Sequence, residues 1–378
     1  MGSGAAVFRP WRRARRKDSV VERISFGIVG GGWRTEFFIR IARALPNRFE
    51  VAGVAIRNGE RRESFKQAWG CPVFANPDQL LDTCAPRFVV TSVSWDCNPG
   101  LVKDLVARGI PVLSETPPAP GIHDLNELYS YVQDHDGKVQ VAEQFHLQPE
   151  HAARLQVIRL GLLGSVTEAE ISCGHGYHGI SLVRRSLGSG LERPVVSART
   201  FLSPVIKGPD RAGPPLEESV ANATRLHVWF DYGDRLGVLD FTDEQYFNWV
   251  RNHRVLIRGD RGEMIDRRVS YLENFRSPVH LELERRCAGV GGNLEGAGLQ
   301  SIHLGDSRVY ENPFRESSLS DEEIAIASCL ENMAAYTAGS DGFYSLAEAC
   351  QDRYLDILCW QSVEQERAVN AEIQAWTG

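Results

Sequence analysis

Short, nearly continuous apolar runs alternate with amphipathic segments from residue 23 to about residue 145. The runs are typical of buried β-strands, and the segments between them place apolar residues at helical spacing. After the first run, for example, Phe37, Ile41 and Leu45 fall on one helical face. The apolar runs cover 23–29, 50–56, 87–93, 109–113 and 138–142, and the clearest helical segments cover 59–70, 99–109 and 123–135. This alternation predicts an α/β fold with a doubly wound parallel sheet.

The pattern changes after about residue 150. A helix is expected over 151–164, and the later strands alternate apolar and polar residues, as antiparallel strands with one covered face do. One hairpin is predicted around Tyr232–Gly233–Asp234 and another between 254–258 and 263–266. Two helices, over 321–337 and 346–369, are expected to end the chain. The sequence therefore predicts two domains that meet near residue 145.

Composition excludes several classes of protein. The net charge of −7 gives no general attraction to nucleic acid, and no apolar run reaches the 18 or so residues of a membrane span. The eight cysteines are scattered without a CxxC pair, as in a cytoplasmic protein with reduced thiols. We interpret residues 1–20 as a disordered extension, since the basic run at 11–17 is a weak signal for an anion-binding tail.

A glycine loop, GGGWRT over 30–35, follows the first apolar run. Read as G-x-G-x-x-G/A, it has Gly30 and Gly32 in the first two positions and the larger Thr35 in the third. The first glycine permits a tight turn, and the second lets a pyrophosphate approach N–H groups at the helix N-terminus. The strand before and the helix after are the context that this motif requires. We therefore predict a Rossmann dinucleotide-binding domain over 21–145.

The second expected strand ends without an acid that would hold the ribose of NAD. Arg57 stands at its tip, where it can stack on adenine, meet the 2′-phosphate of NADP, or remain solvated. The choice between NAD and NADP stays open.

From about residue 24 onward, the chain resembles the glucose–fructose oxidoreductase, inositol dehydrogenase and MocA (Gfo/Idh/MocA) family. The matching stretches are GIVGGGWRT (27–35), VTSVSW (90–95), SETPP (114–118), AEQFHLQP (142–149) and GYHGISLVRRSLG (176–188). The resemblance implies a second domain over 146–378, with an open, mostly antiparallel sheet that serves substrate binding and oligomerisation. It also implies a homo-oligomer, dimer or tetramer, that uses NAD or NADP.

Carried over position by position, the resemblance implies a set of cofactor-binding residues: Gly30, Gly32, Trp33, Arg34, Thr35, Arg57, Ser94, Trp95, Glu115, Thr116, Pro117 and Gln144. The catalytic positions depart from the family. Thr116 stands where the family has a lysine, Gly174 where it has an aspartate, and Ser181 where it has a further acid. Only the family histidine is present, as His178.

His178 is therefore the expected proton-transfer residue, with His175 and Tyr177 as candidates to assist, since a histidine titrates near neutrality. Cys173, His175 and His178, with Glu143 and His146 nearby, do not have the spacing of a zinc site, and no metal is predicted. His146 and Trp249 are candidate substrate contacts. Trp229, in an alternating strand, is interpreted as a core residue.

These features lead to an NAD(P)-dependent oxidoreductase of a sugar, glycoside or cyclitol, with an atypical centre that lacks the usual lysine. Two alternatives stay open. One is a redox-cycling glycosidase with bound NAD, and the other is a dinucleotide-binding pseudoenzyme or regulatory protein. No nucleic-acid or membrane partner is expected.

Overall fold

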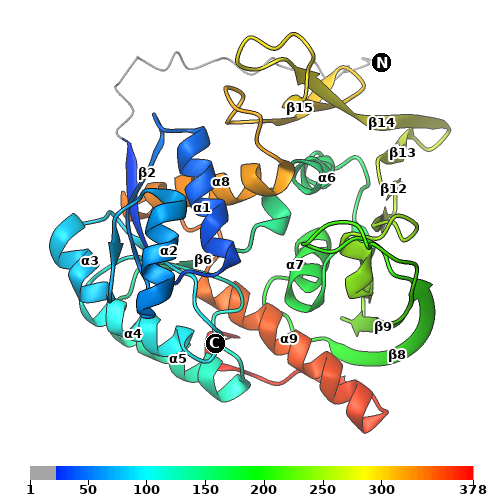
Figure 1. Cartoon of the computed structure of the whole chain (residues 1–378). Coiled ribbons are helices and arrows are strands. Elements are labelled where there is room, and N and C mark those ends of the chain that lie inside the picture. Colours follow the sequence, from blue (N-terminus) through cyan, green and yellow to red (C-terminus); the bar gives the residue numbers. More distant parts are fainter. Residues whose placement is uncertain (1–22, 378) are drawn as a thin grey trace.

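Two sheets organise the chain (Figure 1). The structure, a computed structural model, describes residues 23–377. The extension expected over 1–20 lies outside the described residues. Within the described part, no helix is both long and apolar enough to cross a membrane.

The first sheet has six strands in the order β3-β2-β1-β4-β5-β6, all parallel. Its elements are β1 (Ile24–Val29), α1 (Trp33–Ala44), β2 (Phe49–Ala55), α2 (Gly59–Trp69), β3 (Val73–Phe74), α3 (Pro77–Cys84), β4 (Val89–Thr91), α4 (Asn98–Ala107), β5 (Val112–Ser114), α5 (Ile122–Asp134) and β6 (Val139–Val141). The predicted doubly wound parallel sheet is confirmed. The strand order reverses between β1 and β4, and ligands bind at the carboxyl ends of the strands at such a point.

The second sheet has eleven strands in the order β16-β15-β14-β13-β12-β11-β7-β10-β9-β8-β17. Its strands are β7 (Val166–Ser172), β8 (Val195–Ile206), β9 (Val220–Asp231), β10 (Leu236–Phe241), β11 (Arg254–Gly259), β12 (Gly262–Ile265), β13 (Arg268–Asn274), β14 (Ser277–Ala288), β15 (Gly298–Leu304), β16 (Ser307–Glu311) and β17 (Val369–Asn370). The β7–β10 pair is parallel and the other described pairs are antiparallel, which confirms the mostly antiparallel sheet. Both predicted hairpins are present, as β9–β10 and β11–β12.

Four helices belong to this half of the sequence: α6 (Pro149–Arg159), α7 (Gly176–Leu187), α8 (Asp321–Thr337) and α9 (Leu346–Gln365). Helix α6 ends five residues before the predicted 164, because Gly161 and Gly164 take left-handed backbone conformations. Helix α9 ends at Gln365, where Glu366 is left-handed. Trp229 is not a core residue. It is 54% exposed, because it points to the face of β9 opposite the buried Val228 and Phe230.

Helix α8 lies against α1 and β1 of the first sheet, although it comes late in the sequence (Figure 1). Arg48 makes an ion pair with Glu331 of α8 at 2.6 Å, and the Arg87 guanidinium donates to the Ala334 carbonyl at 2.7 Å. The first sheet is therefore covered in part by a helix from beyond residue 145.

Candidate active site

The glycine loop lies at the carboxyl end of β1 and begins α1. Gly30 has a φ of +121°, and a Cβ there would lie 1.9 Å from the carbonyl oxygen of Ser92 in the loop after β4, so only glycine fits. A Cβ on Gly32 would meet nothing within 4 Å. No side chain caps α1, so the N–H groups at its start stay available to an anion, apart from that of Thr35, which donates to the Gly32 carbonyl at 3.1 Å.

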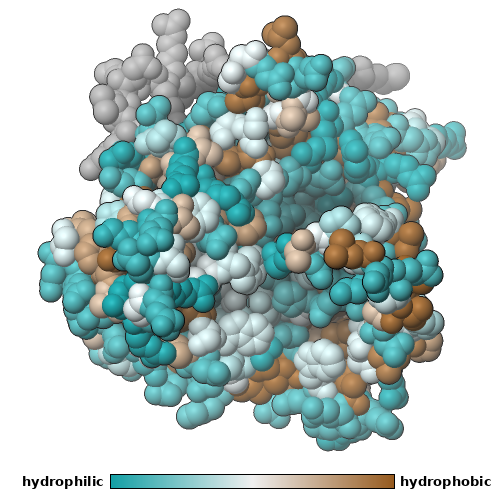
Figure 2. Space-filling model, viewed as in Figure 1, coloured by the Kyte–Doolittle hydropathy of each residue, from teal (hydrophilic) through white to brown (hydrophobic). Residues whose placement is uncertain are grey.

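A cavity of about 1060 Å³ extends from this loop to α7 of the second domain. The space-filling view shows the surface hollowed between the two halves of the molecule (Figure 2). Of the predicted cofactor-binding residues, ten line the cavity: Gly30, Gly32, Trp33, Arg34, Arg57, Ser94, Trp95, Glu115, Thr116 and Gln144. The structure thus brings most of this set together in one space.

Thr35 and Pro117 do not line this cavity. The Thr35 side chain is buried, and its hydroxyl donates to the Gly30 carbonyl at 3.1 Å. Thr35 therefore stabilises the glycine turn and does not face the cavity. Pro117 follows Thr116 through a cis peptide bond and lines a separate small void, together with Glu143 and Tyr344.

Arg34 connects three elements at the inner part of the cavity. Its guanidinium lies 2.8 Å from Glu322 of α8 and 3.7 Å from Glu115, which follows β5. Burial raises the pKa of Glu115 to about 6, although the positive charge of Arg34 opposes that rise. Burial is the main cause that lowers the pKa of His178, and the positive charge of Arg34 lowers this pKa further.

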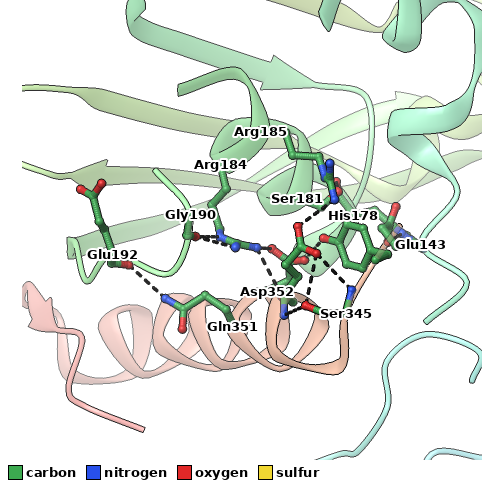
Figure 3. Close-up of polar contacts among 12 residues, drawn as sticks. Glu143, His178, Ser181, Arg184, Arg185, Gly190, Glu192, Ser345, Gln351 and Asp352 are labelled. Carbon is green, nitrogen blue, oxygen red and sulfur yellow. Dashed lines mark hydrogen bonds and ion pairs between the residues drawn. The ribbon is translucent and has the colours of Figure 1, made fainter. Parts of the chain in front are cut away.

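His178, on the first turns of α7, forms a buried pair with Glu143 (Figure 3). His178 Nδ1 lies 2.6 Å from Glu143 Oε2, and the two residues are 5% and 2% exposed. The Phe145 N–H donates to the other carboxyl oxygen at 3.0 Å, and the Phe145 ring stacks on the imidazole with centroids 4.4 Å apart. These contacts fix the ring and leave Nε2 as the nitrogen available to the cavity that His178 lines.

The sequence did not predict Glu143 as the partner of His178. One signal was present: Glu143 comes just after the buried strand β6, at the edge of the sheet where the glycine loop also lies.

Burial sets the protonation of this pair. It raises the pKa of Glu143 to about 8 and lowers the pKa of His178 to about 3, because each charged form loses its hydration. At neutral pH, Glu143 therefore carries a proton and donates a hydrogen bond to His178 Nδ1. Because Nδ1 then accepts, the proton of the neutral imidazole lies on Nε2. Loss of the Glu143 proton at higher pH reverses this hydrogen bond and leaves a lone pair on Nε2.

His175 and Tyr177 lie beside this pair and line the same cavity. The Tyr246 hydroxyl accepts from the His175 backbone N–H at 3.0 Å and lies 2.7 Å from His175 Nδ1. These two contacts hold the His175 ring in place. Burial lowers the pKa of His175 to about 4 and raises the pKa of Tyr177, so both side chains are neutral at pH 7.

The structure explains one departure from the family pattern. A Cβ on Gly174 would lie 3.0 Å from the Phe145 ring and 3.2 Å from the His178 Cβ, so a carboxylate does not fit there without movement. Glu143 approaches His178 instead. The Ser181 hydroxyl donates to the His178 carbonyl at 2.8 Å, within α7.

The two candidate substrate contacts lie outside the cavity. His146 is buried beside Tyr344, with ring centroids 5.2 Å apart, and burial lowers its pKa well below the ordinary range. Trp249 is 69% exposed on the surface.

Among the described residues, no group of three His, Cys, Asp or Glu side chains could hold a metal ion. Cys173 Sγ contacts His151 Nε2 at 3.8 Å, and burial raises the pKa of this thiol to about 12.

Comparison with known proteins gives a match for the first domain. Residues 24–143 match the family model described as oxidoreductase family, NAD-binding Rossmann fold. The first domain therefore matches the Gfo/Idh/MocA family. The cavity fits such a dinucleotide, since Gly30 and Gly32 leave the space that a side chain would fill and α1 offers uncapped N–H groups. No curated protein matches the sequence.

Solved structures similar to this chain share its fold along nearly the whole length. A levoglucosan dehydrogenase in complex with NADH and levoglucosan is 16% identical, with a TM-score of 0.68 over 93% of this chain and 100% of that one. A putative myo-inositol dehydrogenase from Sinorhizobium meliloti is also 16% identical, with a TM-score of 0.64 over 92% and 100%. The WlbA dehydrogenase from Bordetella pertussis, with NADH and UDP-GlcNAcA, is 14% identical, with a TM-score of 0.61 over 93% and 100%.

Proposed function

We propose that this protein is an NAD(P)-dependent oxidoreductase that interconverts an alcohol and a carbonyl on a sugar, glycoside or cyclitol. One observation carries the proposal: a single cavity joins the dinucleotide loop to the buried His178–Glu143 pair. When bound, the dinucleotide supplies the hydride acceptor or donor. The residues of the chain then have to bind the substrate and move one proton.

His178 moves that proton through Nε2. With Glu143 protonated, Nε2–H can donate to a carbonyl oxygen, and with Glu143 ionised, Nε2 can accept the proton of a hydroxyl. Glu143 holds the ring in place and sets its proton, as the acid does in other acid–histidine pairs. Arg34 supplies positive charge near His178 in place of the missing lysine, and it is itself steadied by Glu115 and Glu322.

Polar and aromatic side chains support a carbohydrate as substrate. His175 and Tyr177 present polar groups that can form hydrogen bonds with hydroxyls, and the half-exposed Phe247 adds an aromatic ring to the lining of the same cavity. The levoglucosan and myo-inositol named for two of the similar structures are polyhydroxylated rings of this kind.

We also propose that the chain forms a homo-oligomer through the outer face of the second sheet. Phe201 and Trp229 lie on the outer face of the paired strands β8 and β9, and both are more than half exposed. Apolar side chains gathered on one sheet face are typical of protein contacts. Sedimentation of the wild type and of a Phe201→Glu, Trp229→Glu variant tests this, because the variant should sediment as a monomer.

Replacement of His178 by asparagine tests the catalytic proposal. Wild type should change the nicotinamide absorbance on at least one member of a panel of sugars, glycosides and cyclitols. His178→Asn should lose at least about 100-fold in kcat, since general acid–base groups contribute on that scale, while dinucleotide affinity stays within a few-fold.

Two outcomes would contradict the proposal. Tight dinucleotide binding with no turnover on the whole panel would indicate a pseudoenzyme. Cleavage of a glycoside without added dinucleotide would indicate a redox-cycling glycosidase.

A further inference from the structure

We propose that the dinucleotide of this protein is NADP(H), selected by Arg57 and Arg61 at the turn between β2 and α2. The inference rests on the proposed function only in requiring that the cavity binds a dinucleotide. It concerns the adenosine end of the cavity, far along the sequence from the His178–Glu143 pair.

The first observation is the absence of a carboxylate where a ribose would be held. An NAD-specific Rossmann domain places an Asp or Glu at the tip of the second strand, against the ribose hydroxyls. Here β2 is followed by Ile56, Arg57 and Asn58. The Asn58 side chain is already engaged, because it accepts from the Arg61 N–H at 2.8 Å and caps α2. Asn58 is therefore committed to the helix.

The acids that do line the cavity lie elsewhere. Among the described residues, these are Glu115 and Glu322, and both are paired with Arg34 next to the catalytic histidine. No lining carboxylate repels a phosphate at the β2 end.

The second observation is a pair of cations with no counter-ion. Arg57 and Arg61 are exposed and line the cavity, and neither forms an ion pair with another described residue. Arg61 reaches over the glycine loop, since its Nε lies 3.5 Å from the position of a Cβ on Gly31. Both arginines thus border the space beside the loop that receives the pyrophosphate.

The turn that carries these arginines is held in place. The Arg62 guanidinium donates to the carbonyls of Ile56 and Arg57, at 3.1 Å and 2.9 Å. Arg62 does not line the cavity, whereas Arg57 and Arg61 do. Arg62 therefore supports the turn and leaves the other two arginines free to meet the ligand.

A 2′-phosphate suits this arrangement and a free 2′-hydroxyl does not. The planar guanidinium donates two parallel hydrogen bonds to phosphate oxygens, and charge-assisted bonds of this kind are about twice as strong as neutral ones. NAD offers only a hydroxyl at this position. The two arginines therefore distinguish the two cofactors by one phosphate group.

Equilibrium binding of NADPH and NADH, followed by nicotinamide fluorescence, tests the inference without any substrate. The wild type should bind NADPH at least about tenfold more tightly than NADH, and 2′,5′-ADP should compete where 5′-AMP does not. The Arg57→Ala, Arg61→Ala double variant should bind both nucleotides with similar affinity and keep its NADH affinity within about threefold. Lys66→Ala is the control, because it removes an exposed charge of α2 that lies outside the cavity. This variant should keep the wild-type preference for NADPH over NADH.

Three results would overturn the inference. Equal or tighter binding of NADH by the wild type would do so, while leaving the proposed function intact. An equal loss of affinity for NADPH and NADH in the double variant would show that the arginines stack on adenine and do not bind the 2′-phosphate. Failure to bind either nucleotide would remove both this inference and the proposed function.

Discussion

At the scale of single residues, the proposed catalytic residue His178 pairs with a carboxyl group, that of Glu143, which the sequence did not predict. Glu143 replaces the carboxylate that the family pattern places at position 174, and the Phe145 ring fills the room that a side chain there would need. The two departures are linked, because Phe145 both stacks on His178 and donates its N–H to Glu143.

Gly174→Ala tests this packing. The added Cβ would press on the Phe145 ring and on His178, so the free energy of unfolding should fall by about 1–3 kcal/mol, as in other overpacked cores. Gly100→Ala is the matched control, since a Cβ at this position in α4 meets nothing within 4 Å. Chemical denaturation should show Gly100→Ala at or slightly above wild-type stability. Equal stability of the two variants would contradict the packing.

The protonation of Glu143 gives a pH dependence with a defined sign. Its pKa is raised to about 8, so the pair is an acid below that pH and a base above it. Alcohol oxidation should therefore rise as the pH passes through about 8, and carbonyl reduction should fall. Glu143→Gln keeps a hydrogen bond to Nδ1 but cannot titrate, so the step in kcat/KM should vanish from the pH profile. A step that persists unchanged in Glu143→Gln would assign it to another group.

At the scale of elements, the sequence predicted those strands and helices that have one clear periodicity. The parallel strands are apolar runs in the sequence because both their faces are buried. The β9–β10 hairpin was predicted from the alternation of apolar and polar residues on either side of Gly233. Strand β8 was missed because its alternation stops after Ala198, where residues on both faces become exposed. Helix ends depended on left-handed residues such as Glu366, which composition does not mark.

The loop between β8 and β9 makes a contact that periodicity cannot predict. The Arg211 guanidinium lies 3.8 Å from the centroid of Trp33, at the start of α1, and 5.6 Å from that of Phe247. All three residues line the cavity, so the loop reaches across it from the second domain to the first.

Arg211→Ala should weaken dinucleotide retention. An exposed cation–π contact contributes about 0.5–1 kcal/mol, which corresponds to a two- to fivefold rise in Kd and a faster dissociation rate. Arg211→Lys should recover part of the loss. Stopped-flow fluorescence measures the dissociation rate, and denaturation should show unchanged stability, since Arg211 is exposed. An unchanged dissociation rate in Arg211→Ala would contradict a role for this contact.

At the scale of the whole molecule, the site exists only where distant parts of the sequence meet. The glycine loop, the Thr116 loop and the segment 143–145 follow strands of the first sheet, while His178 comes from α7 and Glu322 from α8. The sequence predicted most members of this site from the family resemblance. It did not predict which side chains touch, because the His178–Glu143 and Arg34–Glu322 contacts depend on how the domains pack.

The position of α8 predicts how the first domain behaves alone. Ile324, Leu330 and Met333 of α8 are fully buried, and the helix lies against α1 and β1. A fragment that ends at residue 145 should expose the surface that α8 covers, bind the dye ANS and melt without a cooperative transition. The full chain should melt cooperatively. A fragment that unfolds cooperatively and binds a dinucleotide as tightly as the full chain would show that α8 is dispensable.

Transfer of a hydrogen label tests the central claim most directly. The protein is incubated with a carbonyl substrate from the panel and with reduced dinucleotide that carries deuterium at both hydrogen positions of the nicotinamide C4, and the mass of the product is measured by mass spectrometry. The account predicts one deuterium at the new carbinol carbon with the wild type, and at most about one hundredth of that rate with His178→Asn at equal dinucleotide occupancy. A product without deuterium, or equal label transfer by His178→Asn, would contradict it.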